Sequence, residues 1–356
     1  MRRVVVWSTG TVGRHAIKGI DAHPGLELVG VWVSNPDKAG KDAGRLADLD
    51  HDLGILATTD REALFALQPD CIVHTAMTDD RTFEAIEDLI EFLERGIDVV
   101  SSGPVLLTFP GQPAFEQYVE RINAAGARTG ASLHVNGIDP GWANDVLPLT
   151  TSSLCQRIDE VRVMEVADYS TYYQPVVMGD LYGFGKPMDH KALMWEPGIL
   201  KSAWGPVVQQ IAAGLDLELD ELVEVVEKAE ATEDLHTVSV DIPAGTLGAV
   251  RFQVQGMVNG TARVVLEHVT RTHPDQRPDW PQPVNGDGGY RVVFTGEPFI
   301  QIDMTHHGEH GDHNVSGMIV TAMRLVNAVD AVCAAPGGLV VAKDLPLVTG
   351  RGLVTR

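Results

Sequence analysis

The sequence has few cysteines, few basic residues and no long hydrophobic run. Three cysteines occur among 356 residues. They lie far apart without a C-x-x-C pair, so we expect neither a disulfide framework nor a thiolate metal site. The 27 lysines and arginines face 49 acidic residues, for a formal net charge of −22. Such a chain lacks the basic footprint of a nucleic-acid-binding protein.

No apolar run approaches the roughly 20 residues that a helix needs to span a bilayer. The short run Val4–Trp7 follows two arginines but has no cleavage site, and it is interpreted as a strand rather than a signal peptide. We therefore expect a cytoplasmic protein that does not bind membranes. Its length exceeds that of one typical domain and predicts two.

The first 150 residues alternate short apolar segments with amphipathic ones. Strands are expected at Val4–Trp7, Leu28–Val33, Cys71–Ala76, Ile97–Ser102 and Ser132–Asn136, with a weaker strand near Ile55–Thr58. One helix should bury Phe83, Ile86, Ile90 and Leu93, with Asp79 and Asp80 as its N-caps. The alternation predicts an α/β fold at residues 1–150, a doubly wound parallel sheet of the Rossmann type.

Extended segments dominate after residue 155. They are Val161–Val166, Thr237–Ile242, Gly248–Val258, Ala262–Val269 and Tyr290–Met304. They predict an α+β substrate domain at residues 151–315 with a large, mostly antiparallel sheet. Asn259-Gly260 is a strong hairpin signal, and a helical stretch is expected near Glu218–Ala229. A helix at about 316–335, capped by Ser316, should pack back on the first domain.

A glycine-rich turn joins the first strand to the first helix. Its residues Ser8, Thr9, Gly10, Thr11, Val12 and Gly13 match G-x-G-x-x-G, with serine in place of the first glycine. Gly10 lets the backbone approach a pyrophosphate, Gly13 lets helix and strand pack closely, and the helix N-terminus offers N–H groups to the phosphates. At the first strand of a βαβ array, this pattern predicts a dinucleotide site.

The end of the second strand bears on the choice of cofactor. Ser34, Asn35 and Lys38 stand where NAD enzymes place an acidic residue for the ribose 2′-hydroxyl. Hydroxyl, amide and ammonium donors suit a 2′-phosphate, so we expect NADP. Asp37 keeps NAD as the alternative.

The carboxyl ends of later parallel strands should edge the cofactor crevice. They carry Thr75, Ala76, Met77, Ser102 and Gly103. The turn that follows residue 135 contains Asn136, Gly137 and Pro140, and it should pass near the nicotinamide. This turn would aim Trp142 at the substrate pocket, with an ordinary core position as the alternative.

A dense polar and aromatic stretch ends the first strand of the second domain. Hydride transfer needs a proton donor or acceptor near the reacting carbon. We expect Asp168 or Glu165 as the base or ammonium partner and Tyr173 as the general acid. Tyr169, Tyr172 and His190 are expected to bind the substrate. The alternative is that these are surface and interface residues, and a lone histidine is more often structural than catalytic.

A histidine-rich stretch before the C-terminal helix superficially resembles a metal site. It contains His306, His307, His310 and His313, with Glu309 and Asp312. Its glycines argue against the helix that H-E-x-x-H requires. We therefore expect a polar loop and no metal.

Four motifs carry a resemblance to a known family. They are S-T-G-T-V-G at 8–13, N-G-I-D-P-G-W-A-N-D-V-L-P at 136–148, G-F-G-K-P at 183–187 and T-A-M-R-L-V-N-A at 321–328. The chain resembles the group of 2,4-diaminopentanoate dehydrogenase and the native amine dehydrogenases. Their N-terminal domain is similar to that of dihydrodipicolinate reductase, whose paired-histidine motif is not matched by the single His190.

The resemblance implies NAD(P)H-dependent interconversion of an amine with a ketone and ammonia. It also implies a homodimer and a pocket between cofactor and sheet. Members of the group place a glutamate just after the fifth α/β strand to handle ammonia and the imine proton. Here that stretch, Ser101–Thr108, contains no carboxylate.

Three functions therefore remain open at this point. The first is an NAD(P)H-dependent oxidoreductase that reduces a small ketone or imine, by reductive amination if a carboxylate is supplied elsewhere. The second is a carbonyl or preformed-imine reductase that does not use ammonia. The third is a non-catalytic NADP(H)-binding sensor. The large second domain, with its aromatic cluster, favours an enzyme.

Overall fold

The computed structural model describes residues 1–308 and 311–354. The chain divides into two compact units. Unit 1 comprises residues 1–142 and the chain from Met318 onward, and unit 2 comprises Ala143–Gly317. The sequence placed these boundaries near residues 150 and 315. Each unit is described by itself.

Unit 1 is built on a six-stranded parallel sheet in the order β14-β5-β4-β3-β1-β2. Its strands are β1 (Arg2–Trp7), β2 (Leu26–Trp32), β3 (Cys71–His74), β4 (Asp98–Ser101), β5 (Ser132–Val135) and β14 (Gly338–Leu339). All paired neighbours run parallel. The α/β Rossmann-type fold predicted from the sequence is confirmed. The weak strand near residues 55–58 is wrong, because that segment makes only isolated bridges.

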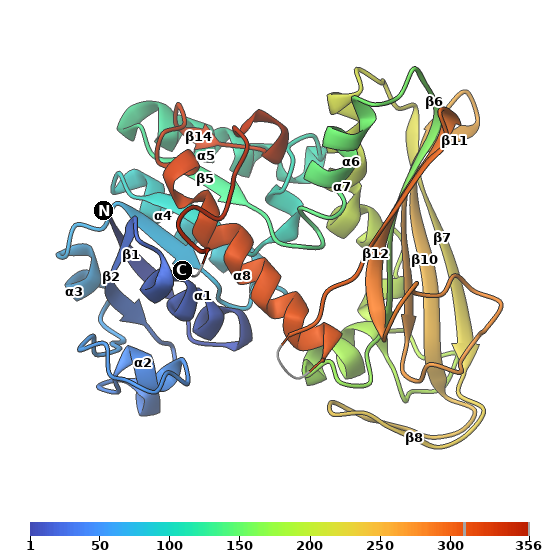
Figure 1. The fold of residues 1–356 in the computed structure, drawn as a ribbon, viewed down its shortest axis with the longest axis horizontal. Helices are drawn as coiled ribbons and strands as arrows, with labels where there is room; N and C mark the ends of the chain where they lie inside the picture. The colour runs from blue at the N-terminus through green and yellow to red at the C-terminus, as the bar shows by residue number, and fades with distance from the viewer. Residues whose placement is uncertain (309–310, 355–356) are drawn as a thin grey trace. The chain divides into compact units, whose positions relative to one another are not determined.

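Helices cover both faces of this sheet (Figure 1). They are α1 (Thr11–Ala22), α2 (Ala43–Leu46), α3 (Arg61–Phe65), α4 (Thr82–Glu94), α5 (Glu116–Thr129) and α8 (His313–Val332), with short turns η1 (Pro36–Lys38), η2 (Val105–Leu107), η3 (Pro113–Phe115) and η6 (Ala342–Asp344). The apolar side chains of α1 and α8 pack with Val4, Val6 and Val31 in one core. Those of α4 and α5 pack with Val5, Trp7 and Ile72 in the other. A sheet covered on both faces explains why its strands are almost uniformly apolar.

Two expectations for α4 are wrong. The residue before the helix is Arg81, without a side-chain capping bond, so Asp79 and Asp80 are not its caps. Phe83 is 55% exposed and approaches Phe115 and Tyr118 instead of the sheet. The buried face contains Ala85, Ile86, Leu89, Ile90, Phe92 and Leu93.

Helix α8 begins at His313, three residues before the predicted cap Ser316, which therefore lies inside its first turn. Among the described residues, α8 is the one helix long and apolar enough to cross a membrane by length and composition. Arg324 and Asp330 interrupt its apolar run, which is why no long run was evident. Leu325 and Val329 are fully buried in unit 1, and Asp330 pairs with Arg2 of β1 at 3.6 Å. These contacts identify a core helix.

Unit 2 contains a six-stranded sheet in the order β13-β12-β6-β11-β10-β7. Its strands are β6 (Arg157–Asp168), β7 (Glu221–Glu230), β10 (Leu247–Val258), β11 (Thr261–Arg271), β12 (Gly288–Glu297) and β13 (Ile300–Met304). Only β6 and β11 pair in parallel among these strands. The mostly antiparallel sheet is confirmed. Asn259 and Gly260 both have positive φ, at 50° and 72°, as the predicted two-residue hairpin turn requires.

The helices of unit 2 lie on one face of its sheet (Figure 1). They are α6 (Val146–Ser152), η4 (Val176–Tyr182), η5 (Leu193–Trp195) and α7 (Ile199–Gly214). Val161 and Val163 of β6 join Phe252 and Trp204 in the core beneath them. On the opposite face, Trp280 from the proline-rich loop packs on β6, β10 and β11.

The helix expected near Glu218–Ala229 is wrong, because this segment is strand β7. It pairs along its length with β10 in antiparallel register. The leucines and valines spaced three and four apart resembled a helical stripe, but Val223, Val225 and Val226 are β-branched and favour a strand. Tertiary pairing therefore overrides the local pattern. The segment expected as a strand at Thr237–Ile242 contains only the two-residue strand β9 (Asp241–Ile242), which pairs with β8 (Leu235–His236) just before it.

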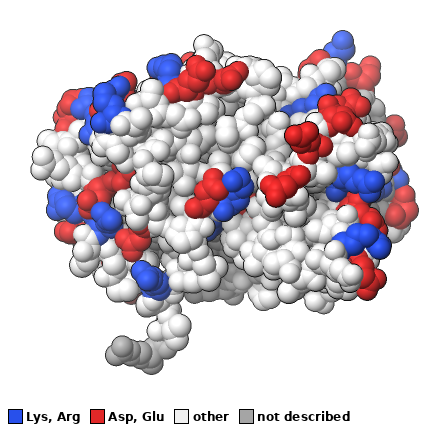
Figure 2. All heavy atoms as spheres, turned by 90° about the horizontal axis from the view of Figure 1, so that it is seen from above, with Lys and Arg blue, Asp and Glu red and all other residues white. Residues whose placement is uncertain are grey.

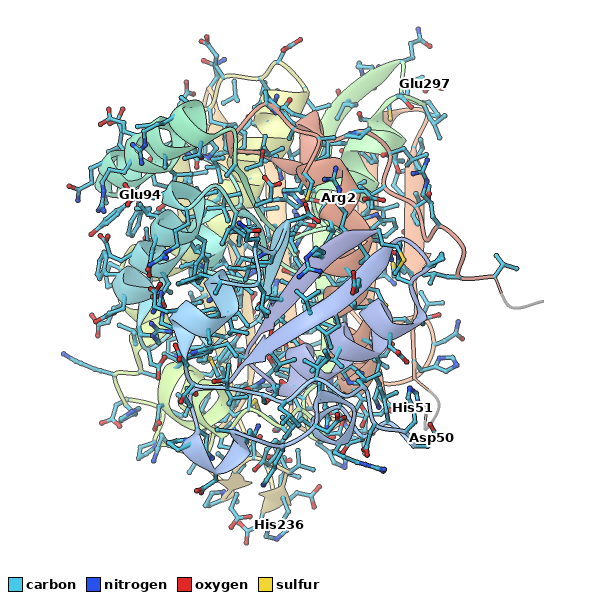
Figure 3. The ribbon with its side chains drawn as sticks, turned by 90° about the vertical axis from the view of Figure 1, so that its left-hand side faces the viewer. Arg2, Asp50, His51, Glu94, His236 and Glu297 are labelled. Atoms are coloured by element: carbon cyan, nitrogen blue, oxygen red, sulfur yellow. The ribbon has the colours of Figure 1, made fainter. Side chains whose placement is uncertain are left out.

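Charged side chains on the surface are interspersed rather than segregated. On the face in Figure 2, basic and acidic side chains lie among one another. Many are paired, such as Arg121 with Glu87 at 2.6 Å. Figure 3 shows Asp50 and His51 together, and this contact with Asp50 raises the pKa of His51. Among the described residues, this face has no continuous basic strip that would attract a polyanion.

Candidate active site

The phosphate loop, Ser8–Gly13, has the backbone geometry of a dinucleotide cradle. Ser8 adopts a φ of 91°, the conformation for which the usual first glycine is suited. Gly10 precedes α1 as its N-cap, so the first N–H groups of the helix are available to phosphate. A Cβ on Gly13 would lie 2.1 Å from the carbonyl oxygen of Ser8. The loop therefore fits a dinucleotide and requires glycine at position 13.

Lys38 reaches the phosphate loop from the turn after β2. Its Nζ donates hydrogen bonds to the carbonyl oxygen and to Oγ1 of Thr9, both at 3.1 Å. Asn35 caps the same turn by accepting a hydrogen bond from the N–H of Asp37 at 2.9 Å, and Ser34 is exposed beside it. The ammonium group thus lies close to the loop that would carry the adenosine phosphates.

The ends of β3 and β4 support the loop. Oγ1 of Thr75 donates to the carbonyl oxygens of Trp7 and Ser8, each at 3.2 Å. The N–H of Ser102 donates to the carbonyl oxygen of His74. A Cβ on Gly103 would lie 2.5 Å from Oγ1 of Thr78. Ala76 is partly buried, and Met77 is 43% exposed. These residues follow the carboxyl ends of the neighbouring parallel strands β3 and β4, and their contact with the cofactor stays a prediction.

Helix α8 fixes the turn after β5. Nε of Arg324 donates to Oδ1 of Asn136 at 2.8 Å, and both side chains are buried. Oγ1 of Thr321 accepts from the N–H of Ile138 at 3.3 Å. Thr321 and Arg324 were not expected from the sequence to have a role, although both lie in the T-A-M-R-L-V-N-A motif at 321–328. Gly137 and Pro140 belong to this turn, and the partly buried Trp142 ends unit 1.

Unit 2 contains a buried carboxylate held by a tyrosine. Glu165 lies on β6 and is 7% exposed. Its Oε1 accepts a hydrogen bond of 2.5 Å from the hydroxyl of Tyr169. Burial, together with the neighbouring Glu165 charge, raises the pKa of Tyr169 well above its usual value. Tyr169 therefore remains a neutral donor and orients the carboxylate.

His268 lies beside this carboxylate and was not singled out from the sequence. It is in direct register with Glu165 across the parallel strands β11 and β6. Its Nδ1 is 3.8 Å from Oε1 of Glu165. The sequence holds one signal for His268, because it is a polar residue on a strand face that otherwise carries Val264 and Leu266. Its partner Glu165, however, lies 103 residues away in the sequence.

Asp168, the alternative carboxylate, points to the other side of β6. Successive strand residues alternate in direction, and Val166, which shares the direction of Asp168, packs with Trp280 on the opposite face of the sheet. Oδ1 of Asp168 accepts from the N–H of Ser170 at 2.8 Å. Burial raises the pKa of Asp168. The structure thus brings Glu165, and not Asp168, together with Tyr169.

The other expected site residues of unit 2 differ in burial. Tyr172 packs on Tyr169, with ring centroids 4.6 Å apart. Tyr173, the expected general acid, is 65% exposed, and His190 is exposed as well. Of Tyr172, Tyr173 and His190, Tyr172 is therefore the one that contacts Tyr169, the hydrogen-bond partner of Glu165, among the described residues of unit 2.

Part of the histidine-rich stretch forms a separate cluster. Nδ1 of His306 lies 2.8 Å from Oγ of Ser316. The ring of His306 stacks on that of Tyr290, with centroids 5.5 Å apart, and the tilted ring of His313 lies 4.4 Å from it. Burial lowers the pKa of His306 to about 4. Glu309 and His310 lie outside the described residues.

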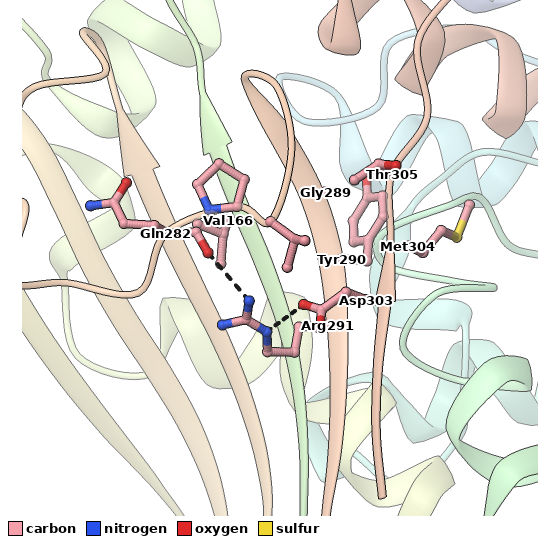
Figure 4. Close-up of a pocket in the computed structure, with 10 residues that line it drawn as sticks. Val166, Gln282, Gly289, Tyr290, Arg291, Asp303, Met304 and Thr305 are labelled. Atoms are coloured by element: carbon pink, nitrogen blue, oxygen red, sulfur yellow. Dashed lines mark hydrogen bonds and ion pairs between the residues drawn. The ribbon is translucent and has the colours of Figure 1, made fainter.

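A small hollow lies at the β12–β13 edge of unit 2 (Figure 4). Arg291 crosses it and donates to Oδ1 of Asp303 at 2.6 Å and to the carbonyl oxygen of Gln282 at 3.3 Å. Its guanidinium is therefore committed to structural contacts within the unit. The expected site residues of this unit lie elsewhere.

Comparison with known proteins agrees with this geometry. Residues 142–352 match the family described as the 2,4-diaminopentanoate dehydrogenase C-terminal domain. An amine dehydrogenase of Streptomyces virginiae is 42% identical over 349 residues, which cover 98% of this chain and 97% of that protein.

Solved structures extend the comparison. An amine dehydrogenase from Mycobacterium smegmatis matches 99% of this chain and 98% of its own, with a TM-score of 0.79 at 20% identity. GenD2 from gentamicin A biosynthesis, solved in complex with NAD, matches 92% of this chain and 86% of its own, with a TM-score of 0.52 at 14% identity.

The relatives and the phosphate loop together support an enzyme over a non-catalytic sensor. The family match covers more than half of the chain, and the match to the Streptomyces amine dehydrogenase covers nearly all of it. The chain therefore belongs to the family of amine dehydrogenases and 2,4-diaminopentanoate dehydrogenases, and it is an NAD(P)-dependent oxidoreductase that acts on amines or imines.

Proposed function

We propose that the protein catalyses reductive amination of a small, largely apolar ketone, with Glu165 as the carboxylate that handles the nitrogen proton. The observation that carries this proposal is the Glu165–Tyr169 hydrogen bond of 2.5 Å in a buried, aromatic part of unit 2. A general base need only reach hydrogen-bond distance of its proton, from any direction. Glu165 thus replaces the glutamate that the Ser101–Thr108 stretch lacks.

The chemistry assigns one proton path to Glu165. When ammonia adds to the carbonyl carbon, the carboxylate takes a proton from the nitrogen and returns it to the alkoxide oxygen, which gives the neutral carbinolamine. A second transfer from nitrogen to the hydroxyl group lets water leave and gives the neutral imine, and a solvent proton passed through Glu165 then protonates the imine nitrogen. When bound, a reduced nicotinamide would supply the hydride for the imine carbon, and the C=N electron pair would remain on the protonated nitrogen. Tyr169 remains protonated throughout and holds the carboxylate in place.

We propose NADP as the preferred cofactor. The position of Lys38, 3.1 Å from two oxygens of Thr9, supports it. An ammonium group beside the phosphate loop can bind a ribose 2′-phosphate, and a charged hydrogen bond of this kind contributes about 1.5–3 kcal/mol. Thr75 and the turn of Asn136 and Gly137 would hold the rest of the dinucleotide.

We further propose a cytoplasmic homodimer. The family resemblance supports the dimer, and the free state of Cys71, Cys155 and Cys333 is compatible with a reducing compartment. Light scattering of the purified protein should give about twice the 38.4 kDa of one chain. A mass equal to one chain at micromolar concentration would refute the dimer.

Reduction of a carbonyl or preformed imine without ammonia is the second candidate. The observation that favours it is η2, which contains the buried Leu106 and Leu107 where the resemblance places a glutamate. This stretch offers ammonia no carboxylate of its own.

Glu165→Gln tests the carboxylate, with Asp168→Asn as the matched control on the same strand. NADPH oxidation is followed against a panel of small ketones with saturating ammonium. We expect Glu165→Gln to lower kcat by about 100-fold or more, the usual range for a general acid–base group, with unchanged affinity for NADPH. Asp168→Asn should retain most of the activity. Full activity of Glu165→Gln would remove this carboxylate from the mechanism.

A further inference from the structure

His268 and Glu165 form a cross-strand pair on the helix-covered face of the unit 2 sheet. Strands β6 and β11 are parallel and in register at these two residues. Both side chains are almost fully buried, at 3% and 7% exposed. Burying a polar pair among apolar side chains costs folding free energy unless its groups interact. A pair that is kept in spite of this cost is a candidate for a role in function.

Aromatic side chains fix the ring of His268. Phe252 is its direct neighbour on β10, and the two rings stack with centroids 4.8 Å apart and planes 20° apart. The indole of Trp204, from α7, meets the imidazole edge-on at 5.0 Å. An imidazole packed on two sides has little freedom to turn, and its Nδ1 stays 3.8 Å from Oε1 of Glu165.

Tyr169 and His268 both lie next to the same oxygen of the Glu165 carboxylate. Oε1 accepts the hydrogen bond of Tyr169, and it is also the oxygen that faces Nδ1 of His268. Tyr169 approaches from beyond the end of β6, whereas His268 approaches from the neighbouring strand. The hydrogen bond on one side of Oε1 and the polar nitrogen of a fixed imidazole, 3.8 Å away on the other, together favour one orientation of the carboxyl group.

We propose that His268 is a positioning residue for the reaction: together with Tyr169 it holds Oε1 of Glu165 and so presents Oε2 to the substrate nitrogen. This inference rests on the proposed role of Glu165. It adds that His268 touches neither substrate nor cofactor and acts through the carboxylate.

His268→Phe tests this role, because phenylalanine preserves the aromatic stack with Phe252 and Trp204 but removes both ring nitrogens. We expect kcat to fall about tenfold to 100-fold, less than the loss of about 100-fold or more expected for a general acid–base group itself, while the KM for the ketone changes less than threefold. His236→Phe, at a position whose side chain is 80% exposed, is the matched control and should change none of these quantities.

A second variant separates positioning from folding. His268→Asn carries an amide N–H close to the position of Nδ1 and therefore keeps a polar nitrogen near Oε1 of Glu165. We expect its kcat to lie between those of the wild type and His268→Phe. Melting temperatures report whether either variant has lost its fold.

The outcomes distinguish this inference from the proposed function. If Glu165→Gln is inactive while a folded His268→Phe keeps wild-type kcat, His268 has no positioning role and the function of Glu165 stands. If Glu165→Gln is fully active, the proposed function fails and the inference fails with it. A kcat of folded His268→Asn as low as that of His268→Phe, or a KM for the ketone that rises as much as kcat falls, would show a purely structural role and overturn the inference.

Discussion

The hydroxyl of Tyr169 donates a 2.5 Å hydrogen bond to Oε1 of Glu165. Glu165 precedes Tyr169 by four residues and lies near the end of β6. Burial and the carboxylate charge raise the pKa of Tyr169 well above its usual range. This phenol is therefore an orienting donor and not the proton source of the reaction.

Tyr169→Phe should lower kcat about tenfold and leave the alkaline limb of the pH profile unchanged up to about pH 10, the usual tyrosine pKa. The physical reason is that the wild-type phenol stays protonated over this range. Steady-state rates at saturating ketone and ammonium from pH 6 to 10 measure both effects. Loss of a wild-type alkaline limb in Tyr169→Phe would show that Tyr169 does titrate during catalysis.

Lys38→Ala should weaken the binding of NADPH about tenfold or more and leave that of NADH nearly unchanged, because a charged hydrogen bond contributes about 1.5–3 kcal/mol. Cofactor fluorescence titration gives both dissociation constants. Lys41→Ala is the control, since Lys41 is exposed at the end of the same segment. Equal weakening of both cofactors by Lys38→Ala would contradict the assignment of Lys38 to the 2′-phosphate.

Gly13→Ala should destabilise unit 1 by about 2 kcal/mol or more and weaken both cofactors, because its Cβ would lie 2.1 Å from the backbone oxygen of Ser8 and overpacking costs about 1–3 kcal/mol. Chemical denaturation without cofactor measures the change. An unchanged free energy of unfolding in Gly13→Ala would show that the loop can relax.

Ser8→Gly should have the opposite effect on stability. The substitution relieves a φ of 91° and should raise the free energy of unfolding, measured in the same way, by about 1 kcal/mol.

Acid should destabilise the protein between pH 6.5 and 4. Burial lowers the pKa values of His74 and His134, each to about 4 from 6.5. In the unfolded chain these imidazoles bind a proton below about pH 6.5, whereas in the folded protein they stay neutral until about pH 4. The free energy of unfolding therefore falls as the pH decreases from 6.5 to 4, and it levels off below this window. Each group contributes up to about 1.4 kcal/mol per pH unit.

Urea titrations at pH 7, 5.5 and 4.5 measure this dependence. His134→Asn retains a donor for the carbonyl oxygen of Val340, which now lies 2.8 Å from Nδ1, and it should flatten the curve. Stability that does not change from pH 7 to 4.5 would contradict the burial of neutral histidines.

The cofactor half of the site could be predicted from sequence because its signals are local. The phosphate loop and the strand ends that edge it each lie within a few residues of a recognisable strand. The substrate half could not, because its partners are distant in the chain. His268 meets Glu165 across 103 residues, and only the pairing of β6 with β11 reveals it.

Alternation along β6 could have separated the two carboxylates in advance. Glu165 shares the direction of Val161 and Val163, whereas Asp168 shares that of Val166. The same kind of reasoning failed at β7, where leucines and valines fit a helical stripe as well as a strand. There the pairing with β10 determines that the segment is a strand, and the local sequence pattern does not show this pairing.

Reductive amination is tested most directly by the product formed from a ketone, ¹⁵N-labelled ammonium and NADPH. We predict one ¹⁵N-labelled amine for each NADPH oxidised, no oxidation without ammonium, and loss of both in Glu165→Gln. Formation of the alcohol, or NADPH oxidation at the same rate without ammonium, would contradict the account and leave a carbonyl reductase in its place.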